Sequence, residues 1–508
     1  MKAPTKPRPL VFQATESHAR RSPPYRVNKN LTFLLLLLAL ACFTCFGSAY
    51  YLFTTRWDFR PVSAPSSIAN ANSTIKATAS ESAARLNEKY LSYLPHSGFH
   101  NQRIAFENAL VLAYLLRRTL LVPPIRLGNT PIHYVEYTSL SRHHELSNRE
   151  GLSHCPRLPL YLSRPPECLE YFEFSYVPWT WLVDLATIAD HQTLVHRINM
   201  SQAWISDNFD ILPSDIYTLR DDSPYQFRFL DTATDSSPLD HRYLEDIYID
   251  KLRTVDQRLL QIGTLFGTSR LRLKQRNNIA YRALVRRMMI FTNKDLTHVA
   301  DSIARSLEGA FLGVHLRSGD GPFKSKIDNT IQSVLWKILY DVLGFSHMET
   351  CKLEESFGEE DLGLCNLKKT TVTNSKSSIT APPPFSFPRS SRLKCRWRRH
   401  LENRYHLLNI PLYIATDLEN PDIHPLLSTF RKTFPCIFFL KDFAAETQSL
   451  KQLKSPHDGV DLRHFALPFV DALVLGRALK VVGTEGSTFS QFAEDVLWTS
   501  YHLQMPSD

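Results

Sequence analysis

Apolar residues alternate between short strand-like runs and helical spacing from about residue 86 onward. Residues 90–94 (YLSYL) predict a strand, and residues 103–118 carry apolar positions at helical spacing. Residues 119–122 (TLLV) predict a buried strand that ends at the following proline pair. The order strand, loop, helix, strand is typical of the opening of a doubly wound parallel sheet. The next stretch, 125–290, is aromatic-rich and mixed, and its pattern predicts no order of elements.

The same alternation returns in the C-terminal half. A helix is predicted at 295–308 and a strand at 311–316 (FLGVHL). Further strands are predicted at 412–415, 436–440 and 480–483, and further helices from 421, at about 464–478 and from 487. The Ser/Thr/Pro-rich segment 366–392 between them predicts a disordered insertion. We therefore expect the α/β fold class, with two Rossmann-like domains that face a central cleft and divide near residue 290.

An uncharged apolar run of 23 residues occupies positions 31–53. About 20 such residues span a bilayer, and the basic residues of 1–30 predict a cytosolic N-terminus. The alternative is a cleaved signal peptide, because Gly47-Ser48-Ala49 is a small-x-small pattern. The apolar run is longer than a usual signal peptide's, however, which favours a retained anchor. We therefore expect a single-pass type II membrane protein with a polar stem at 54–85.

Composition narrows the class of protein. Hydrophobic residues make up 43% of the 508 residues, which is enough for sizeable cores and excludes a disordered chain. The formal net charge is +9, but the segment 1–30 carries seven basic residues and one acid. Most of the excess therefore lies in the tail, and we expect no nucleic-acid partner.

Six cysteines lie outside the expected anchor, and an even number is typical of disulfides in an oxidising compartment. Cys155 and Cys168 are a plausible local pair, whereas the pairing of the other four is open. Zinc is the rival interpretation, but no C-x2-C pair occurs outside the anchor. Sequons at Asn72 and Asn199 weakly support a lumenal body.

Glycine is scarce, yet two short windows hold three glycines each. In the first, FLGVHLRSGDGPF, a strand ends in His315 and Arg317, which point to one face at its carboxyl end. Ligands of open α/β sheets bind there, and arginine can hold a diphosphate bidentately. The alternative is an ion pair of Arg317 with Asp320 that only shapes the turn.

In the second window, GRALKVVGTEGSTFS, a strand is followed by a glycine turn and by Ser487 at the start of a helix. Free N–H groups and hydroxyl donors at such a helix start favour an anion. The alternative, an ordinary serine cap, is the commoner event.

The loop HSGFHNQ at 96–102 ends one strand and opens a helix, so its histidines and Asn101 could face the cleft. The alternative is a helix start capped by Ser97 or Asn101. The pair Asp221-Asp222 is the nearest approach to a metal motif, but adjacent acids are usually a solvated turn. No D-x-D occurs in the chain, which argues against the metal-bound nucleotide-sugar site of single-Rossmann (GT-A) transferases.

HLRSGD, ATD and STFS in this order, behind an F-x-N-Q loop, resemble the GDP-fucose protein O-fucosyltransferase family over about 88–128 and 310–500. The resemblance implies a GT-B fold, with an acceptor-side domain at 86–290 and a nucleotide-sugar domain at 291–508. It also implies inverting transfer of fucose from GDP-fucose to a Ser/Thr hydroxyl, with no cofactor and no required metal.

The resemblance also assigns roles. It implies that Arg317 binds the β-phosphate and stabilises the leaving GDP, and that Asn101 lies at the reacting centre. Nucleotide-sugar contacts are implied for His315, Arg317, Asp320, Asp417, Ser487, Thr488, Phe489 and Ser490, and less directly for Asp471. His100 stands where the family pattern has Gly. His100 or Glu107 could be the base, or the held diphosphate could suffice without one.

The sequence therefore predicts a fucosyltransferase of the Golgi or endoplasmic reticulum, with a lumenal body and a protein or glycan acceptor. Two alternatives stay open. One is an enzyme of the same scaffold that uses another nucleotide sugar. The other is a non-catalytic lumenal binding protein.

Overall fold

The structure is a computed structural model. It describes residues 87–159, 161–232, 242–319, 321–357 and 394–502, together with part of 37–46. The chain divides into two compact units, Met1–Ala77 and Thr78–Asp508.

Most of the expected anchor at 31–53 lies outside the described residues, as do the tail 1–30, the stem 54–85 and the insertion 366–392. The described part of 37–46 is helical and exposed. Within the described ranges, no helix is both long and apolar enough to cross a membrane. The anchor therefore stays a prediction.

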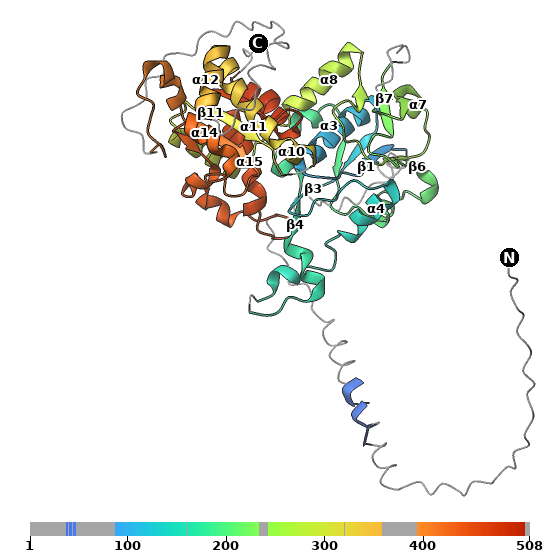
Figure 1. Ribbon diagram of the computed structural model, residues 1–508. Helices are drawn as coiled ribbons and strands as arrows, with labels where there is room; N and C mark the ends of the chain where they lie inside the picture. Colours follow the sequence, from blue (N-terminus) through green and yellow to red (C-terminus); the bar gives the residue numbers. More distant parts are fainter. Residues whose placement is uncertain are drawn as a thin grey trace, which may run out of the picture. The chain divides into compact units, whose positions relative to one another are not determined.

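Two parallel sheets organise the second unit (Figure 1). The first has the order β5-β2-β1-β9-β6 and the second the order β13-β12-β11-β14. Their strands are β1 (Tyr90–Tyr93), β2 (Thr119–Val122), β5 (Leu194–His196), β6 (Ile216–Leu219), β9 (Leu259–Ile262), β11 (Leu312–Leu316), β12 (Leu412–Thr416), β13 (Ile437–Phe438) and β14 (Lys480–Gly483). Every strand pair in both sheets is parallel, which confirms the α/β class with parallel sheets.

Two smaller sheets complete the strand inventory of the described residues. One is antiparallel and pairs β3 (Ile125–Gly128) with β4 (Phe174–Val177). The other is parallel, with the order β10-β7-β8, from β7 (Phe227–Leu230), β8 (Glu245–Tyr248) and β10 (Leu271–Arg272).

Helices cover the sheets and connect them. They are α3 (Phe99–Leu116), α4 (Tyr137–Leu146), α5 (Ala186–Ala189), α6 (Gln202–Phe209), α7 (Ile249–Arg253), α8 (Arg276–Arg287), α9 (Lys294–Ser306), α10 (Gly321–Ser325), α11 (Ile327–Trp336), α12 (His347–Phe357), α14 (Ser428–Thr433), α15 (Arg463–Gly476), α16 (Thr488–Phe492) and α17 (Thr499–His502). Helix α3 packs on β1 and β2, and α15 packs on β11 and β12. Because α3 is apolar around most of its circumference, it is buried along nearly its whole length.

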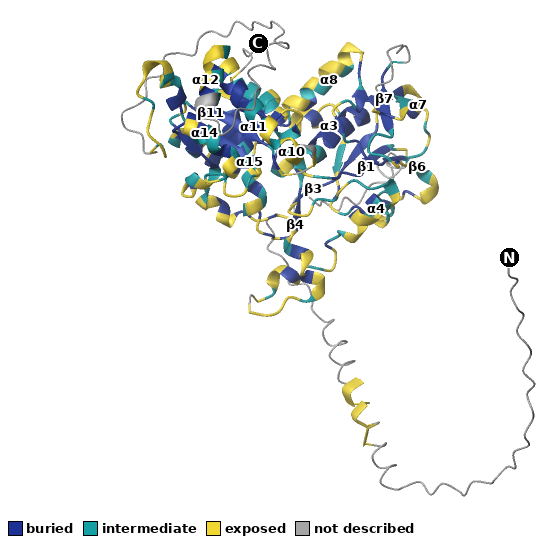
Figure 2. Ribbon diagram, in the orientation of Figure 1, coloured by how far each residue is buried: buried dark blue, intermediate teal, exposed yellow. Residues whose placement is uncertain are grey.

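One hydrophobic cluster runs through both sheets. It includes Leu91 of β1, Leu110 of α3 and Leu475 of α15. Figure 2 shows buried residues in strands of both sheets, such as β1 and β11. At its middle, Phe469 of α15 lies 4.7 Å from the Phe99 ring and 5.4 Å from the Phe291 ring, measured between centroids. The two sheets therefore share a core, and the division near residue 290 stays a prediction.

Candidate functional site

The chain turns sharply after β11, and one carboxylate holds the turn. Asp417, which follows β12, accepts hydrogen bonds from Ser318 N and Ser318 Oγ, both at 2.7 Å, and from Gly319 N at 2.9 Å. Its Oδ2 also lies 3.1 Å from Arg317 Nη1, in an ion pair whose side chains are about a third exposed. Because β11 and β12 are parallel neighbours, their carboxyl ends bring Arg317 and Asp417 together.

The same contacts keep Asp417 ionised. Burial alone would raise the pKa of Asp417, but hydrogen bonds from Ser318 and the charge of Arg317 lower it below its usual value. A negatively charged Asp417 orients the Arg317 guanidinium, and an incoming phosphate would compete for that guanidinium. The ion pair that the structure shows joins Arg317 to Asp417, and the alternative of a pair with Asp320 that only shapes the turn stays untested. Asp320, the partner expected from sequence, lies outside the described residues.

Strand β14 leads into α16 through a glycine turn. Gly486 has a φ of +77°, which favours glycine, and Ser487 caps α16 by accepting a hydrogen bond from Ser490 N at 3.3 Å. Gly483 has another role, because a Cβ there would lie 2.4 Å from Ser490 Cβ. The absence of a side chain at position 483 lets α16 approach the sheet closely, which brings its first turn beside β11.

His315 joins β11 to α16. Its Nδ1 lies 2.7 Å from Ser490 Oγ, and its ring stacks on Phe489 with centroids 4.2 Å apart. Burial, with a smaller contribution from Arg317, lowers the pKa of His315 to about 3, although Asp417 acts in the opposite direction. His315 is therefore neutral at physiological pH and positions Phe489 without adding charge.

The start of α3 meets α16 at this place. Thr488 Oγ1 donates a long hydrogen bond to Asn101 Oδ1 at 3.4 Å, and the His100 ring lies 5.0 Å from the Phe489 ring. Asn101, which the resemblance placed at the reacting centre, thus lies against the turn that carries the expected anion-binding residues. The structure brings together His100, Asn101, His315, Arg317, Asp417, Ser487, Thr488, Phe489 and Ser490.

The two candidate bases differ. Burial is the main cause that lowers the pKa of His100 well below its usual value, and Arg103, His315 and Arg317 add to it. His100 Nδ1 is buried and has no hydrogen-bond partner, so His100 is neutral but a weak proton acceptor. Glu107 lies farther along α3, paired with Arg103 and 3.8 Å from Arg286 Nε. Its carboxylate is thus engaged in a buried ion pair, and a role of Glu107 as the base stays a prediction.

Two other acids have structural roles. Asp471 Oδ1 accepts a hydrogen bond of 2.6 Å from Tyr413, whose side chain is fully buried, and the nucleotide contact expected of Asp471 stays a prediction. Asp221 is not part of a solvated turn, because it is buried and its Oδ2 accepts from Thr264 N at 2.8 Å.

Thr484 also lies at the candidate site, although the sequence did not single it out. Its Oγ1 accepts from Arg317 N at 3.0 Å and lies 3.2 Å from the His315 carbonyl oxygen. Its position directly after a predicted strand, in the same glycine-containing window as Ser487, could have identified Thr484 from the sequence.

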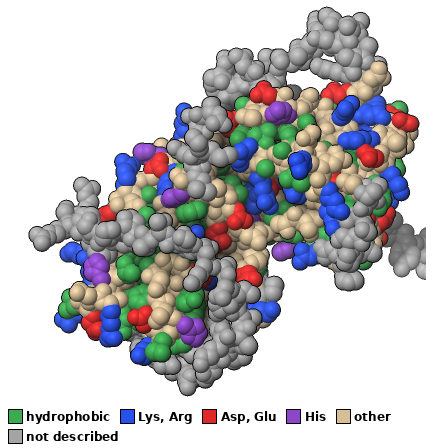
Figure 3. Space-filling view, turned by 90° about the horizontal axis from the view of Figure 1, so that it is seen from above, with side chains coloured by type: hydrophobic (Ala, Val, Ile, Leu, Met, Phe, Trp, Pro, Cys, Tyr) green, Lys and Arg blue, Asp and Glu red, His purple; other side chains and the backbone are tan. Residues whose placement is uncertain are grey.

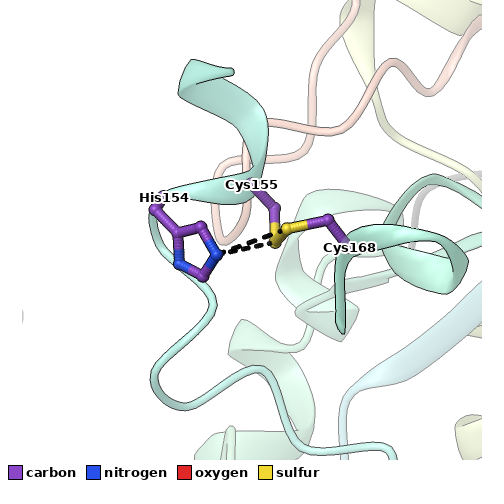
Figure 4. A group of neighbouring side chains, drawn as sticks. All are labelled: His154, Cys155 and Cys168. Atoms are coloured by element: carbon purple, nitrogen blue, oxygen red, sulfur yellow. Dashed lines mark hydrogen bonds between the residues drawn. A yellow bond between two sulfur atoms is a disulfide. The ribbon is translucent and has the colours of Figure 1, made fainter. Parts of the chain in front are cut away.

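One cluster contains the residue types of a metal site, but its two cysteines form a disulfide. Figure 4 shows His154 beside Cys155 and Cys168, whose sulfurs form a disulfide, so the expected local pair is confirmed. His154 Nε2 lies 3.4 Å from Cys168 Sγ. A second disulfide joins Cys395 and Cys436, a pairing that the sequence had left open, and Cys351 is disulfide-bonded as well. Sulfurs bonded to each other are not the thiolates that zinc requires.

Comparisons with known proteins give a short sequence match and distant structural likenesses. No protein-family model matches the chain. It is 58% identical over 40 residues to "O-fucosyltransferase 30" of Arabidopsis thaliana, a match that covers 8% of each sequence. A crystal structure of POFUT1 in complex with GDP-fucose aligns with 80% of this chain and 93% of its own, at 12% identity and a TM-score of 0.33. A POFUT1 complex with GDP gives 13% and 0.32 over 80% and 94%. TM-scores this low support no argument about fold or function.

Proposed function

We propose that this chain is a glycosyltransferase that moves fucose from GDP-fucose to an acceptor hydroxyl, with inversion at the sugar carbon. The observation that carries the proposal is the convergence of Arg317, Asp417 and the Ser487–Ser490 turn at neighbouring strand ends, opposite Asn101. A guanidinium beside a hydroxyl-rich helix start suits a nucleotide diphosphate. The 40-residue match to a protein named an O-fucosyltransferase supports fucose as the sugar.

In this proposal Arg317 supplies most of the rate enhancement. As the bond between sugar and diphosphate breaks, negative charge grows on the departing GDP, and a preorganised guanidinium stabilises it. His315 and Phe489 would contact the guanine ring of GDP, and Asn101 would orient the reacting groups. Because a proton on His100 is disfavoured, we propose that no strong base takes part. The acceptor oxygen bonds to the sugar carbon as the bond from that carbon to the diphosphate breaks, and the proton of the acceptor hydroxyl is released to water. No metal takes part in the proposed step.

The resemblance favours a Ser or Thr hydroxyl of a protein as the acceptor, and a glycan hydroxyl is the alternative. The proposal places the body in the lumen of the Golgi or endoplasmic reticulum, behind the apolar run 31–53. The two disulfides support an oxidising compartment.

The test is GDP release from GDP-fucose by the purified protein in EDTA. Arg317→Ala should lower the rate by about 100-fold or more, as expected for the loss of a charge-stabilising donor. Arg305→Ala, at an exposed position of α9 away from the site, should leave it unchanged. Normal turnover by Arg317→Ala would contradict the proposal. Lack of both GDP binding and GDP release would favour a non-catalytic protein.

A further inference from the structure

Strand β5 forms one edge of the first sheet, and only one of its sides is paired. On that side it runs parallel to β2, and Leu120 N of β2 donates to Thr193 O at 3.1 Å. In a strand the N–H and C=O of one residue point to the same side, and the sides alternate from residue to residue. Thr193 therefore faces β2, whereas the backbone groups of Leu194 and His196 point outward. Within the described ranges, no hydrogen bond to protein satisfies these outward groups.

A groove lies beside this free edge. Its volume is about 680 Å³, within the range of roughly 300–1,000 Å³ that is typical of ligand sites. Its walls include the exposed Ala186 and Ala189 of α5, together with Thr292. Leu194 and His196, whose backbone groups point outward, also line it. The unpaired edge therefore borders a hollow that a ligand can enter.

One polar side chain in the groove lacks a partner. The amide nitrogen and the amide oxygen of Gln192 are both buried, and neither has a hydrogen-bond partner among the described residues. Leaving buried polar atoms unsatisfied costs free energy, so a matching ligand should supply both an acceptor and a donor. A peptide unit has that pair of groups.

The charges of the groove also select among ligands. Its lining contains one acid, the exposed Asp184, and no Lys or Arg. The groove therefore suits a neutral or basic ligand and repels an acidic one. On the face seen in Figure 3, by contrast, Lys and Arg side chains are mixed with Asp and Glu, so charge there does not single out a partner.

We propose that the free edge of β5 and its groove bind an extended segment of the acceptor polypeptide, which adds to the sheet as a further strand. This inference rests on the proposed transferase function, and it chooses a protein hydroxyl over a glycan hydroxyl. Outward N–H and C=O groups at strand spacing match a polypeptide backbone, whereas a glycan has no such regular row of donors and acceptors.

The size of the edge favours a flexible segment over a second folded copy of this chain. Strand β5 has three residues. Such an edge, with its groove, offers far less surface than the roughly 1,200 Å² that a stable interface between folded proteins buries. An extended segment needs only a few backbone hydrogen bonds and one or two side-chain contacts to dock there.

The position of β5 leads such a segment toward the candidate site. Because β5, β2 and β1 are parallel, their carboxyl ends lie at one edge of the sheet, where the loop after β1 leads to Asn101. Leu194 also packs against the hydrophobic cluster that contains most of α3, so the groove lies on the α3 side of this sheet. A strand added beyond β5 would lie three strand spacings, or about 14 Å, from β1. About five further extended residues can span that distance and bring a hydroxyl to the site.

The experiment uses calorimetry to measure binding of an end-blocked nonapeptide, KTVTVTVTK, to the full-length protein. This peptide is basic, carries hydroxyl groups and is rich in strand-forming residues. It should bind, whereas the same peptide with every Thr and Val N-methylated should bind at least about ten-fold more weakly, because those residues have no N–H to donate. The acidic peptide ETVTVTVTE should also bind more weakly than KTVTVTVTK.

Two variants test the place of binding. Leu194→Pro removes an outward N–H but no hydrogen bond to β2, a change that edge strands tolerate, and it should weaken binding of KTVTVTVTK about ten-fold. Ala189→Trp fills the groove from α5 and leaves the strand intact, so it should weaken binding similarly even if the proline variant fails to fold. Ala283→Trp makes the same change at an exposed position of α8 and should not affect binding.

Release of GDP from GDP-fucose without acceptor separates this inference from the proposed function. Ala189→Trp should release GDP at the normal rate, since Ala189 does not contact the site. If KTVTVTVTK does not bind, if its N-methylated form binds as well, or if Ala189→Trp binds it normally, the inference is wrong while the transferase function stands. A dimer that Leu194→Pro disrupts in sedimentation would assign the edge to a second copy and would also overturn the inference. If the unaltered protein binds KTVTVTVTK but neither binds nor releases GDP, the transferase function fails and with it the acceptor role.

Discussion

At the scale of single residues, the candidate site depends on one carboxylate. Asp417 holds the turn after β11 through three hydrogen bonds and orients Arg317 through the fourth contact. Its role is thus to position the guanidinium. Both parts of that role need a negative charge, because hydrogen bonds to a charged acceptor are stronger than those to a neutral one.

Asp417→Asn should therefore weaken GDP binding by about ten-fold or more, while leaving the circular dichroism spectrum unchanged. An amide cannot accept on both of its ends, so either the Ser318 donors or Gly319 N and Arg317 would lose their acceptor, and Arg317 would lose its counter-charge in both cases. Calorimetry with GDP measures the effect, and Glu419→Gln, two residues away and exposed, is the matched control. Equal affinity in Asp417→Asn and Glu419→Gln would remove Asp417 from the site.

At the scale of elements, the candidate site exists because α16 approaches β14 closely. Gly483 permits this approach, since any side chain there would overlap Ser490. The hydrogen bond between Ser490 and His315 and the stacking of Phe489 both follow from it.

Gly483→Ala should push α16 outward and weaken GDP binding by about ten-fold, because the strain acts on a whole helix start. Its cost in unfolding free energy should be about 1–3 kcal/mol, typical of overpacking. The matched control is Gly98→Ala, in the loop between β1 and α3, where an added Cβ would have no atom within 4 Å. Thermal denaturation and GDP calorimetry measure the pair, and equal behaviour of the two variants would contradict the close-approach argument.

The sequence predicted those elements whose apolar runs are uninterrupted. The strands at 119–122 and 480–483 match the structure at both ends, and 90–94, 311–316 and 412–415 match within one residue. It did not predict β5, β6 and β9, which complete the first sheet. These strands have only three or four residues each and lie within long irregular connections, so no period develops. Site residues at strand ends were predictable, because a strand end is visible in the pattern. The second contact of Glu107, with Arg286, was not predictable, because Arg286 is 179 positions away in the sequence.

At the scale of the whole molecule, a loop of the C-terminal half is inserted into the N-terminal half. Asp458 accepts a hydrogen bond from Ser175 Oγ at 2.8 Å, and its backbone oxygen accepts from Tyr171 Oη at 2.9 Å. Arg149 Nε lies 3.7 Å from Asp458 Oδ2, and both side chains are buried. Nearby Val460 packs in one small cluster with Cys155 and Cys168.

Asp458→Ala should lower the free energy of unfolding by about 3 kcal/mol, because it leaves Arg149 buried without its counter-charge. Urea denaturation measures the loss. Lys454→Ala, in the same loop but exposed, should change the free energy by no more than about 0.5 kcal/mol. A change that small for Asp458→Ala would mean that the loop contributes little to holding the halves together.

The whole fold should also weaken in mild acid. Burial lowers the pKa of His315 and His144 to about 3 and that of His96 to about 4. In the unfolded chain these groups bind protons near pH 6.5, so the free energy of unfolding falls as the pH drops below that value. From pH 7.5 to 5 each can remove up to about 2 kcal/mol.

Urea denaturation at both pH values tests this slope. His144→Gln should make the slope shallower, because the glutamine amide can donate to the Pro95 oxygen as His144 Nε2 does but takes up no proton. A slope that His144→Gln leaves unchanged would show that His144 is not one of its sources.

The core shared by the two sheets limits how a nucleotide could enter and leave the proposed site. Phe99, Phe291 and Phe469 join the halves in one apolar layer, so the halves cannot part to let a spent nucleotide leave without exposing that layer to water. In the proposed enzyme, GDP would then leave through the exposed turns at Gly319 and at Glu485 and Gly486, which lie beside Arg317 and Ser487 in the sequence. The rate of repeated turnover would then depend on movement of these two short backbone segments and not on a hinge between the halves.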